Sequence, residues 1–403
     1  MYFIAFIITL SQYYGYALFS ICAVALAQEY ISDGDLTSKL TSFFLILASA
    51  VLVKPLASII FGTIGDYLGR AKALKFSSIS ATIAMFILAF VPGHSNIGVY
   101  GVFLLLFSRI LILISVTGQS DGIRIYITEH ISKTKINFAN GLISTCAQFG
   151  VLLAALIMFL LSKYNFSYKF AFLIGGILGT LTIYLRKSLI ETKEFQERKN
   201  NINIFAYLRE NYKLMLIAIL IQGSLGGMYH FYIIFSVSYL KILSAKGIIG
   251  IVNPYLISAV SIGTYAIFSP LAGYLADKYK FIPAYSGIIL SFGLCVSSIV
   301  FSIYQYSVLY IISIILQAAL IPFYSVAMPI YIRKKLPVSV RYRVFSFTHS
   351  IGSVVISSPT PLIANIIWQK TSLQWLNTIY PAVLLTLLFC ALTYICRDKE
   401  EYS

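Results

Sequence analysis

Twelve long apolar stretches follow one another along almost the whole chain, and this repetition constrains the fold more than any other feature. A helix of about 20 apolar residues crosses the roughly 30 Å hydrocarbon core of a bilayer. Each stretch is long enough for one crossing, so we predict an all-α membrane protein with twelve transmembrane helices. The stretches are 2–27, 42–64, 74–92, 97–127, 136–161, 168–187, 214–240, 252–276, 282–303, 306–332, 342–367 and 374–396.

The composition excludes most other classes of protein. Of the 403 residues, 59% are apolar and 11% are charged, and the mean hydropathy is +0.86. Soluble domains carry about 45–50% apolar and roughly 25% charged residues, so a soluble enzyme is excluded. The five cysteines lie in apolar stretches without a CxxC pair, so the sequence indicates neither a disulfide framework nor a metal site.

The basic residues indicate the orientation in the membrane. The formal net charge is +16. With a cytoplasmic N-terminus, 22 of the 30 Lys and Arg lie in inward loops or at inner helix ends, and six lie outside. This bias follows the positive-inside rule, so the charge reflects topology and does not indicate a nucleic-acid partner. The even number of helices then places both termini in the cytoplasm.

A polar stretch between the sixth and seventh predicted helices divides the chain into two sets of six. It covers residues 188–212, and its charges alternate in sign. The prediction is a six-helix bundle at 1–187, a cytoplasmic linker at 188–212 and a second six-helix bundle at 213–403. A repeated motif supports two related halves, because the second helix ends in Gly62-x-x-x-Asp66 and the eighth in Gly273-x-x-x-Asp277.

The first copy of this motif belongs to the segment FGTIGDYLGRAKAL, residues 61–74. The segment resembles the loop between helices two and three of the major facilitator superfamily. The resemblance implies the major facilitator fold and transport by alternating access. Asp66 is then expected to stabilise the positive N-terminal end of a neighbouring helix or to pair with an arginine. The implied gating residues are Gly62, Asp66, Gly69, Arg70, Gly273 and Asp277.

Further segments resemble one group within that superfamily, the metabolite:proton symporters, which include proline/betaine and citrate carriers. The fourth helix of the group is matched by Arg109, Gly118, Glu129 and His130, and a signature of its second helix by Lys54-Pro55-Leu56. Residues 165–195 are similar to its sixth helix, and residues 336–352 to the start of its eleventh. The resemblance implies a monomeric secondary transporter of a bacterial inner membrane that uses no cofactor.

The implied solute is a small carboxylate-bearing molecule, either a proline/betaine-like osmolyte or an organic acid, with a proton or sodium as the candidate coupling ion. Two alternatives stay open, an uncoupled facilitator or exchanger and a transport-dead sensor derived from a carrier. The sequence contains no Walker loop, HExxH or GxSxG motif, so we do not expect an enzyme.

The chain departs from this group where the group carries acids. Helix one of the group usually shows Glu-x-Tyr-Asp-Phe, and the same register here shows Gln12-Tyr13-Tyr14-Gly15-Tyr16. In helix four the position of a glutamate is occupied by Gln119. The chain therefore lacks the acids to which the resemblance would assign proton coupling.

Two cations, Lys54 and Arg109, lie at the centres of predicted helices, and none of the fourteen acids does. A charge at that depth costs at least about 2.5–3.5 kcal/mol on insertion scales, and an anionic solute would compensate it. We hypothesise that both cations face the central cavity and bind a carboxylate. The alternative is a structural role with hydrogen bonds to neighbouring groups. The predicted substrate-binding residues are Arg109, Lys54, Gln119, Gln12, Tyr13 and Tyr16.

Three other residues are candidates for carrying a coupling proton. His230 and His349 contain the side chain that titrates near neutral pH, and Asp121 is the acid nearest to the centre of a predicted helix. For the two histidines the alternative is hydrogen bonding between helices. For the helix-one tyrosines, the two interpretations are a cage for a quaternary ammonium group and ordinary packing.

Overall fold

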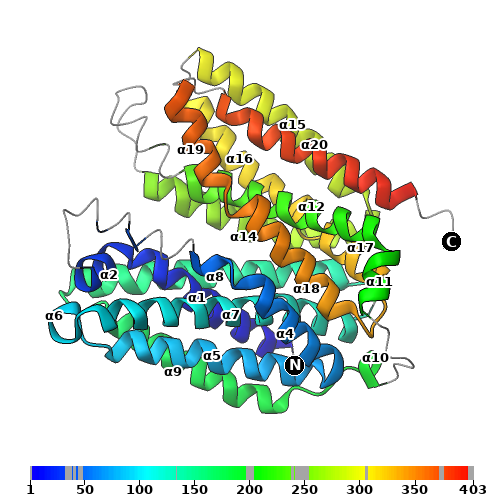
Figure 1. The fold of residues 1–403 in the computed structure, drawn as a ribbon. Helices are drawn as coiled ribbons and strands as arrows, with labels where there is room; N and C mark the ends of the chain where they lie inside the picture. Colours follow the sequence, from blue (N-terminus) through cyan, green and yellow to red (C-terminus); the bar gives the residue numbers. More distant parts are fainter. Residues whose placement is uncertain are drawn as a thin grey trace. The chain divides into compact units, whose positions relative to one another are not determined.

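The computed structural model describes residues 2–31, 39, 42–43, 49–132, 134–196, 204–236, 240, 254–304, 307–371 and 376–397. All secondary structure in these residues is helical (Figure 1). The chain forms two compact units. Unit 1 comprises Met1–His130, Cys146–Asn201 and Val338–Phe347, and unit 2 comprises Ile131–Thr145, Ile202–Pro337 and Thr348–Ser403.

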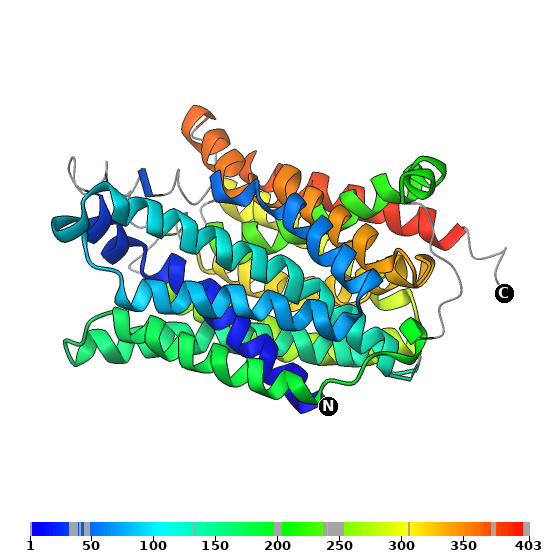
Figure 2. The same cartoon turned by 60° about the horizontal axis from the view of Figure 1, so that its bottom comes forward.

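Unit 1 is built mainly from the first half of the chain. Helix α5 packs against both α7 and α9, and α1 also lies against α7 and α9 (Figure 2). The helices are α1 (Tyr2–Ile21), α2 (Ala23–Tyr30), α4 (Lys54–Tyr67), α5 (Arg70–Phe90), α6 (His94–Ile97), α7 (Val99–His130), most of α8 (Ile136–Lys163), α9 (Lys169–Leu185), the 3-10 turn η1 (Arg186–Ser188), α10 (Lys193–Gln196) and the start of α18 (Arg341–Gly352).

Small residues allow the helices of unit 1 to approach closely, as is common between transmembrane helices. A Cβ atom added at Gly179 on α9 would contact the Thr82 side chain on α5. The core of unit 1 contains the fully buried side chains of Tyr14 and Phe172. The Tyr14 hydroxyl donates a 2.8 Å hydrogen bond to the carbonyl oxygen of Ala171, which fixes α1 to α9.

Unit 2 is built mainly from the second half of the chain. Helix α16 packs against α14 and α15, and α12 packs against α20 and a π-helical segment, η3. The helices are α11 (Ile204–Glu210), α12 (Tyr212–Tyr229), the π-helix η2 (His230–Phe235), α14 (Pro254–Tyr279), α15 (Ile282–Ile303), α16 (Ser307–Ser325), α17 (Met328–Lys335), the rest of α18, the π-helix η3 (Ser353–Ser357), α19 (Thr360–Thr371) and α20 (Leu376–Arg397).

Each of the twelve predicted stretches is mainly helical over its described residues, but several are interrupted by turns or are not single α-helices. Ten helices in the described part of the chain are long and apolar enough to cross a membrane, and Lys169–Leu185 is shorter at 17 residues. The stretch 342–367 is interrupted by η3 and by a turn at Ser358 and Pro359. Proline lacks the N–H that the interior of an α-helix needs, and Pro359 lies in the turn that separates η3 from α19, which begins at Thr360.

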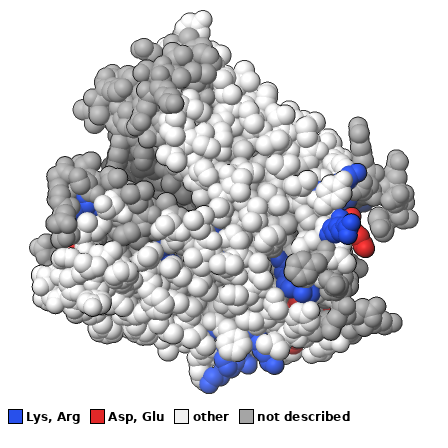
Figure 3. Space-filling view, viewed as in Figure 1, with Lys and Arg blue, Asp and Glu red and all other residues white. Residues whose placement is uncertain are grey.

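The flanks of the helices present large apolar side chains to the surroundings. Phe90, Phe103 and Ile177 are each more than half exposed. In Figure 3 most of the surface in view is free of charged side chains, and the larger clusters of Lys and Arg lie toward the right and lower edges. An apolar flank with charges at the helix ends suits a helix that spans a bilayer.

Candidate functional site

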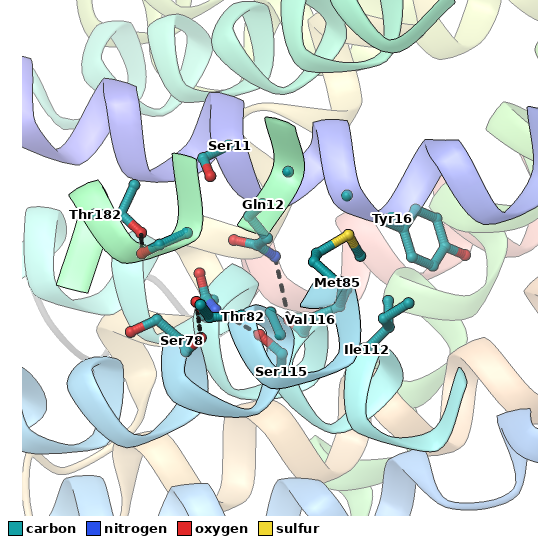
Figure 4. Close-up of a pocket in the computed structure, with 15 residues that line it drawn as sticks. Ser11, Gln12, Tyr16, Ser78, Thr82, Met85, Ile112, Ser115, Val116 and Thr182 are labelled. Carbon is teal, nitrogen blue, oxygen red and sulfur yellow. Dashed lines mark hydrogen bonds between the residues drawn. The ribbon is translucent and has the colours of Figure 1, made fainter. Parts of the chain in front are cut away.

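A small polar cavity lies inside unit 1, between α1, α5, α7 and α9 (Figure 4). Its volume of about 20 Å³ is enough for a water molecule and too small for a metabolite. Two residues predicted to bind substrate, Gln12 and Gln119, line it together with Tyr16. The other lining residues are Ser11, Gly15, Ser78, Ala81, Thr82, Met85, Ile112, Ser115, Val116, Gly175, Gly179 and Thr182.

At one end of the cavity, three of the predicted residues come together around the Tyr16 side chain. The Arg109 guanidinium carbon lies 5.2 Å from the centre of the Tyr16 ring and 5.0 Å from that of Phe19. Lys54 is near enough for its charge to act on Tyr16. The structure therefore brings both predicted membrane cations to one tyrosine.

Arg109 is enclosed in unit 1 instead of facing an open cavity. Its side chain is buried, with 4% of the residue exposed, and its Nε and Nη1 atoms have no hydrogen-bond partner. The two flanking rings provide cation–π attraction but no hydrogen-bond acceptor for these nitrogens. A buried guanidinium with free donors is costly, so an anionic group would stabilise it.

A second buried arginine, Arg186, which the sequence analysis did not select, binds Gln119 in the wall of the cavity. Arg186 Nη2 donates a 2.8 Å hydrogen bond to Gln119 Oε1, and Gln119 Nε2 donates a 2.5 Å bond to Ser115 Oγ. Gln119 thus has protein partners on both sides of its amide. The available signal for Arg186 was the arginine at the exit of the sixth helix, within the segment 165–195.

The remaining predicted residues of helix one differ in their contacts. Tyr13 and Ser120 share a 3.1 Å hydrogen bond between their hydroxyl groups, so the Tyr13 hydroxyl joins α1 to α7. Gln12 donates a long 3.4 Å bond to the carbonyl oxygen of Val116, and its Oε1 is buried without a partner. Gln12 therefore presents an unused acceptor beside the cavity.

Asp66 makes both of the contacts that its motif predicts. Its carboxylate accepts hydrogen bonds from the backbone N–H groups of Tyr342 and Arg343, at 3.2 and 3.0 Å, in the first turn of α18. It also forms ion pairs with Arg70 at 3.1 Å and with Arg343 at 3.2 Å. A Cβ atom at Gly62 would lie 2.5 Å from the Cα of Arg343, so Gly62 permits this close approach.

Arg70 extends the same cluster toward the linker. It pairs with Glu129 at 3.1 Å, and its backbone N–H donates a 2.9 Å bond to Glu191. Gly69 has a φ of +117° and contacts the Glu191 carboxylate, which suits glycine at this turn.

Arg341 bridges Glu129 at 3.1 Å and Glu194 at 2.6 Å. The sequence analysis did not assign Glu191, Glu194, Arg341 or Arg343 to the cluster, although Glu191 and Glu194 lie in the segment 165–195 that resembles the sixth helix of the related group.

Asp277 has the equivalent arrangement in unit 2. Its carboxylate accepts bonds of 3.0 and 2.8 Å from the backbone N–H groups of Asn137 and Phe138, in the first turn of α8, and a 2.8 Å bond from the Asn137 amide. Gly273 contacts the Asn137 carbonyl so closely that a side chain would not fit. The two aspartates thus cap two helix N-termini in the same way.

The three candidate proton carriers lie in different places. His230 begins η2, and its Nδ1 lies 2.7 Å from the carbonyl oxygen of Ser357 in η3, so it makes a helix–helix hydrogen bond. His349 is half-buried on α18, and Asp121 is buried on α7. None of the three lines the cavity of unit 1.

Comparison with known proteins adds a family and a fold to this geometry. Residues 3–206 match the family model described as sugar (and other) transporter. The chain is 23% identical over 394 residues to the glycine betaine/proline/ectoine/pipecolic acid transporter OusA of Dickeya dadantii (strain 3937). This alignment covers 92% of the chain and 77% of that protein. It is 22% identical over 376 residues to the citrate-proton symporter of Klebsiella pneumoniae, covering 89% and 83%.

Among solved structures, the chain resembles the proton:xylose symporter XylE of the major facilitator superfamily bound to 6-bromo-6-deoxy-D-glucose. The TM-score is 0.75 at 15% identity, over 98% of this chain and 94% of that chain. This likeness confirms the predicted major facilitator fold.

Proposed function

The chain belongs to the sugar (and other) transporter family, so it is a membrane transporter of small solutes and not an enzyme, and we propose that its solute carries a carboxylate. The observation that carries this proposal is the buried Arg109 guanidinium with two free donors. A guanidinium binds a carboxylate through two parallel charge-assisted hydrogen bonds. Lys54 would add a second positive charge beside the same site.

The names of the relatives agree with this class of solute. Betaine, proline, ectoine, pipecolic acid and citrate, which appear in the names of two relatives, all carry at least one carboxylate. The proposed solute is therefore a small osmolyte or organic acid. Because the cavity has room for a water molecule only, solute binding requires a state of the protein in which unit 1 is open beside Arg109.

We assign the gates to the two aspartate clusters. In the proposed cycle, Asp66 releases the start of α18 and Asp277 releases the start of α8 when the inner side opens. Both carboxylates bind helix N-termini through several hydrogen bonds at once, so each cluster forms or breaks as a unit. We further propose a monomer in a bacterial inner membrane with both termini in the cytoplasm, in accordance with the distribution of Lys and Arg.

Uptake into liposomes tests the role of Arg109. The purified protein is reconstituted, and the uptake of labelled proline, glycine betaine and citrate is followed with and without an inward proton gradient. Arg109→Gln is expected to abolish uptake, because loss of one partner of a buried charged pair costs about 2–5 kcal/mol of binding free energy. Arg109→Lys should retain part of the activity, since it keeps the charge but loses the fork of donors.

The matched control is Lys187→Gln, which removes an exposed cation next to Arg186 and should leave uptake unchanged. Normal uptake by correctly inserted Arg109→Gln would refute the binding role. Uptake that only equilibrates the solute would favour the uncoupled facilitator or exchanger. Absence of flux for every carboxylate solute would favour the transport-dead sensor.

A further inference from the structure

Unit 1 contains two buried arginines with unused hydrogen-bond donors, and both lie beside residues of the same polar cavity. Arg109 and Arg186 are 4% and 3% exposed, and Nε and Nη1 of each have no hydrogen-bond partner within the described residues. Arg109 lies over the ring of Tyr16, and Arg186 donates a 2.8 Å hydrogen bond to Gln119. Tyr16 and Gln119 both line the cavity. Buried guanidinium donors without partners are costly, and an anion satisfies them.

The helical register places both arginines on the faces that line this cavity. Its lining residues are Ile112, Ser115, Val116 and Gln119 on α7 and Gly175, Gly179 and Thr182 on α9. Arg109 precedes Ile112 by three residues, and Arg186 follows Thr182 by four and keeps α-helical backbone angles, with φ −69° and ψ −12°. Residues three or four apart lie on the same face of a helix. Each arginine therefore extends the lining face of its helix by one turn.

The two guanidinium groups lie too far apart to share one carboxylate. Gln119, to which Arg186 binds, is ten residues beyond Arg109 on α7, which is about 15 Å along the helix axis. The guanidinium of Arg109 does not reach back toward Gln119, because it lies over the rings of Tyr16 and Phe19. A carboxylate oxygen lies only about 2.7–2.9 Å from the nitrogen that donates to it. Two anionic groups are therefore needed to satisfy both arginines.

The wall of the cavity supplies neither of these anionic groups. None of its fifteen lining residues is Asp, Glu, Lys, Arg or His (Figure 4). Gln119, the wall residue that binds Arg186, is a neutral amide. The negative charges must come from outside the cavity wall, and a transported solute is one source of them.

We propose that Arg186 is a second anion-binding residue of the transport site, and that Arg109 and Arg186 together select a solute with two carboxylates. This inference rests on the proposed function, in which Arg109 binds one carboxylate, and it narrows the solute to a dicarboxylic or tricarboxylic acid with a short carbon skeleton. Each guanidinium binds one end of the solute through charge-assisted hydrogen bonds. Proline and glycine betaine have a single carboxylate, so they leave Arg186 without an anion and bind more weakly.

Succinate and its monoamide, succinamate, are the probes for this proposal, because they share one skeleton and differ by one carboxylate. Their affinities for the purified full-length protein are measured by isothermal titration calorimetry near neutral pH, where carboxylates are ionised. We expect succinate to bind roughly 30 to 4,000 times more tightly than succinamate, the factor for one partner of a buried charge pair. Lys187→Gln, which removes an exposed cation next to Arg186, should leave this ratio unchanged.

Two variants remove the anion-binding capacity of Arg186 in different ways. Arg186→Gln removes its charge. Gln119→Glu keeps the arginine but gives it a carboxylate of the protein, at the side chain to which it already donates a 2.8 Å bond. Both variants should bring the ratio of the two affinities close to one. An arginine with only a structural role would leave the ratio in Gln119→Glu at its native value.

A ratio close to one in the native protein, or an unchanged ratio in Gln119→Glu, would overturn the inference. Binding of proline or glycine betaine without a preference for succinate over succinamate would also overturn it, while leaving the proposed function intact. Failure of all four compounds to bind would refute the proposed function and this inference with it. If Arg186→Gln does not fold, Gln119→Glu still decides the question, because it retains both arginines.

Discussion

Substitution of Asp66 by Asn should release the first turn of α18 from unit 1. The carboxylate accepts bonds from the backbone N–H groups of Tyr342 and Arg343 and pairs with the guanidinium groups of Arg70 and Arg343. Asp66 is buried, with 1% of its surface exposed. Removing one partner of a buried ion pair costs about 3–5 kcal/mol, since it leaves the other charge uncompensated. At about 1.4 kcal/mol per factor of ten, the opened state becomes roughly 100 to 4,000 times more populated.

Hydrogen–deuterium exchange of the segment Val338–Phe347 measures this population directly. In detergent or nanodiscs, the amides of this segment should exchange faster by that factor in Asp66→Asn. Asp277→Asn is the matched control, because Asp277 caps α8 in unit 2 and should accelerate exchange at the start of α8 instead. An acceleration of less than tenfold, or an equal effect of Asp277→Asn on Val338–Phe347, would contradict the assignment of Asp66 as the cap of α18.

Two glycine substitutions should lower thermal stability for different reasons. Gly69→Ala places a side chain at a φ of +117° and against Glu191. We expect it to lower the free energy of unfolding by about 1–3 kcal/mol, measured as a lower melting temperature by thermal-shift fluorimetry. An unchanged melting temperature would show that the turn tolerates the side chain. Gly179→Val should lower the free energy of unfolding by about 1–3 kcal/mol, because it overpacks α9 against Thr82. Gly293→Ala, with open space around the added atom, should have little effect. Equal effects of the two substitutions would refute the packing argument.

The sequence predicted the helices well because the bilayer imposes a single length and polarity on each of them. It predicted the interruptions less well, since the π-helical turns at His230–Phe235 and Ser353–Ser357 depend on tertiary packing between η3 and α12. The apolar pattern of a stretch does not distinguish a π-helical turn from an α-helical one.

The contacts of the candidate site were likewise predictable from the sequence only in part. The local motif around Asp66 indicated a helix cap or an arginine partner, and the structure has both. The identity of the partners could not be derived, because Asp66 and Arg343 are 277 residues apart. The Arg186–Gln119 hydrogen bond was missed for the same reason. The residues around each of the two do not indicate its partner, and only the fold brings the two side chains together.

The positions that lack the expected acids are not equivalent, and this difference bears on coupling. At Gly15, an added Cβ would lie 3.1 Å from the Met85 side chain, so packing has taken the place of the acid and an aspartate would have to displace a core methionine. At Gln119, the amide still accepts a bond from Arg186, so a glutamate would fit there and form a buried ion pair. The Arg109 guanidinium instead lies over the rings of Tyr16 and Phe19. The loss of acids therefore leaves Arg186 with a neutral partner in Gln119, whereas the buried Nε and Nη1 donors of Arg109 have no partner and are donors that an anion of the solute would satisfy in the proposed function.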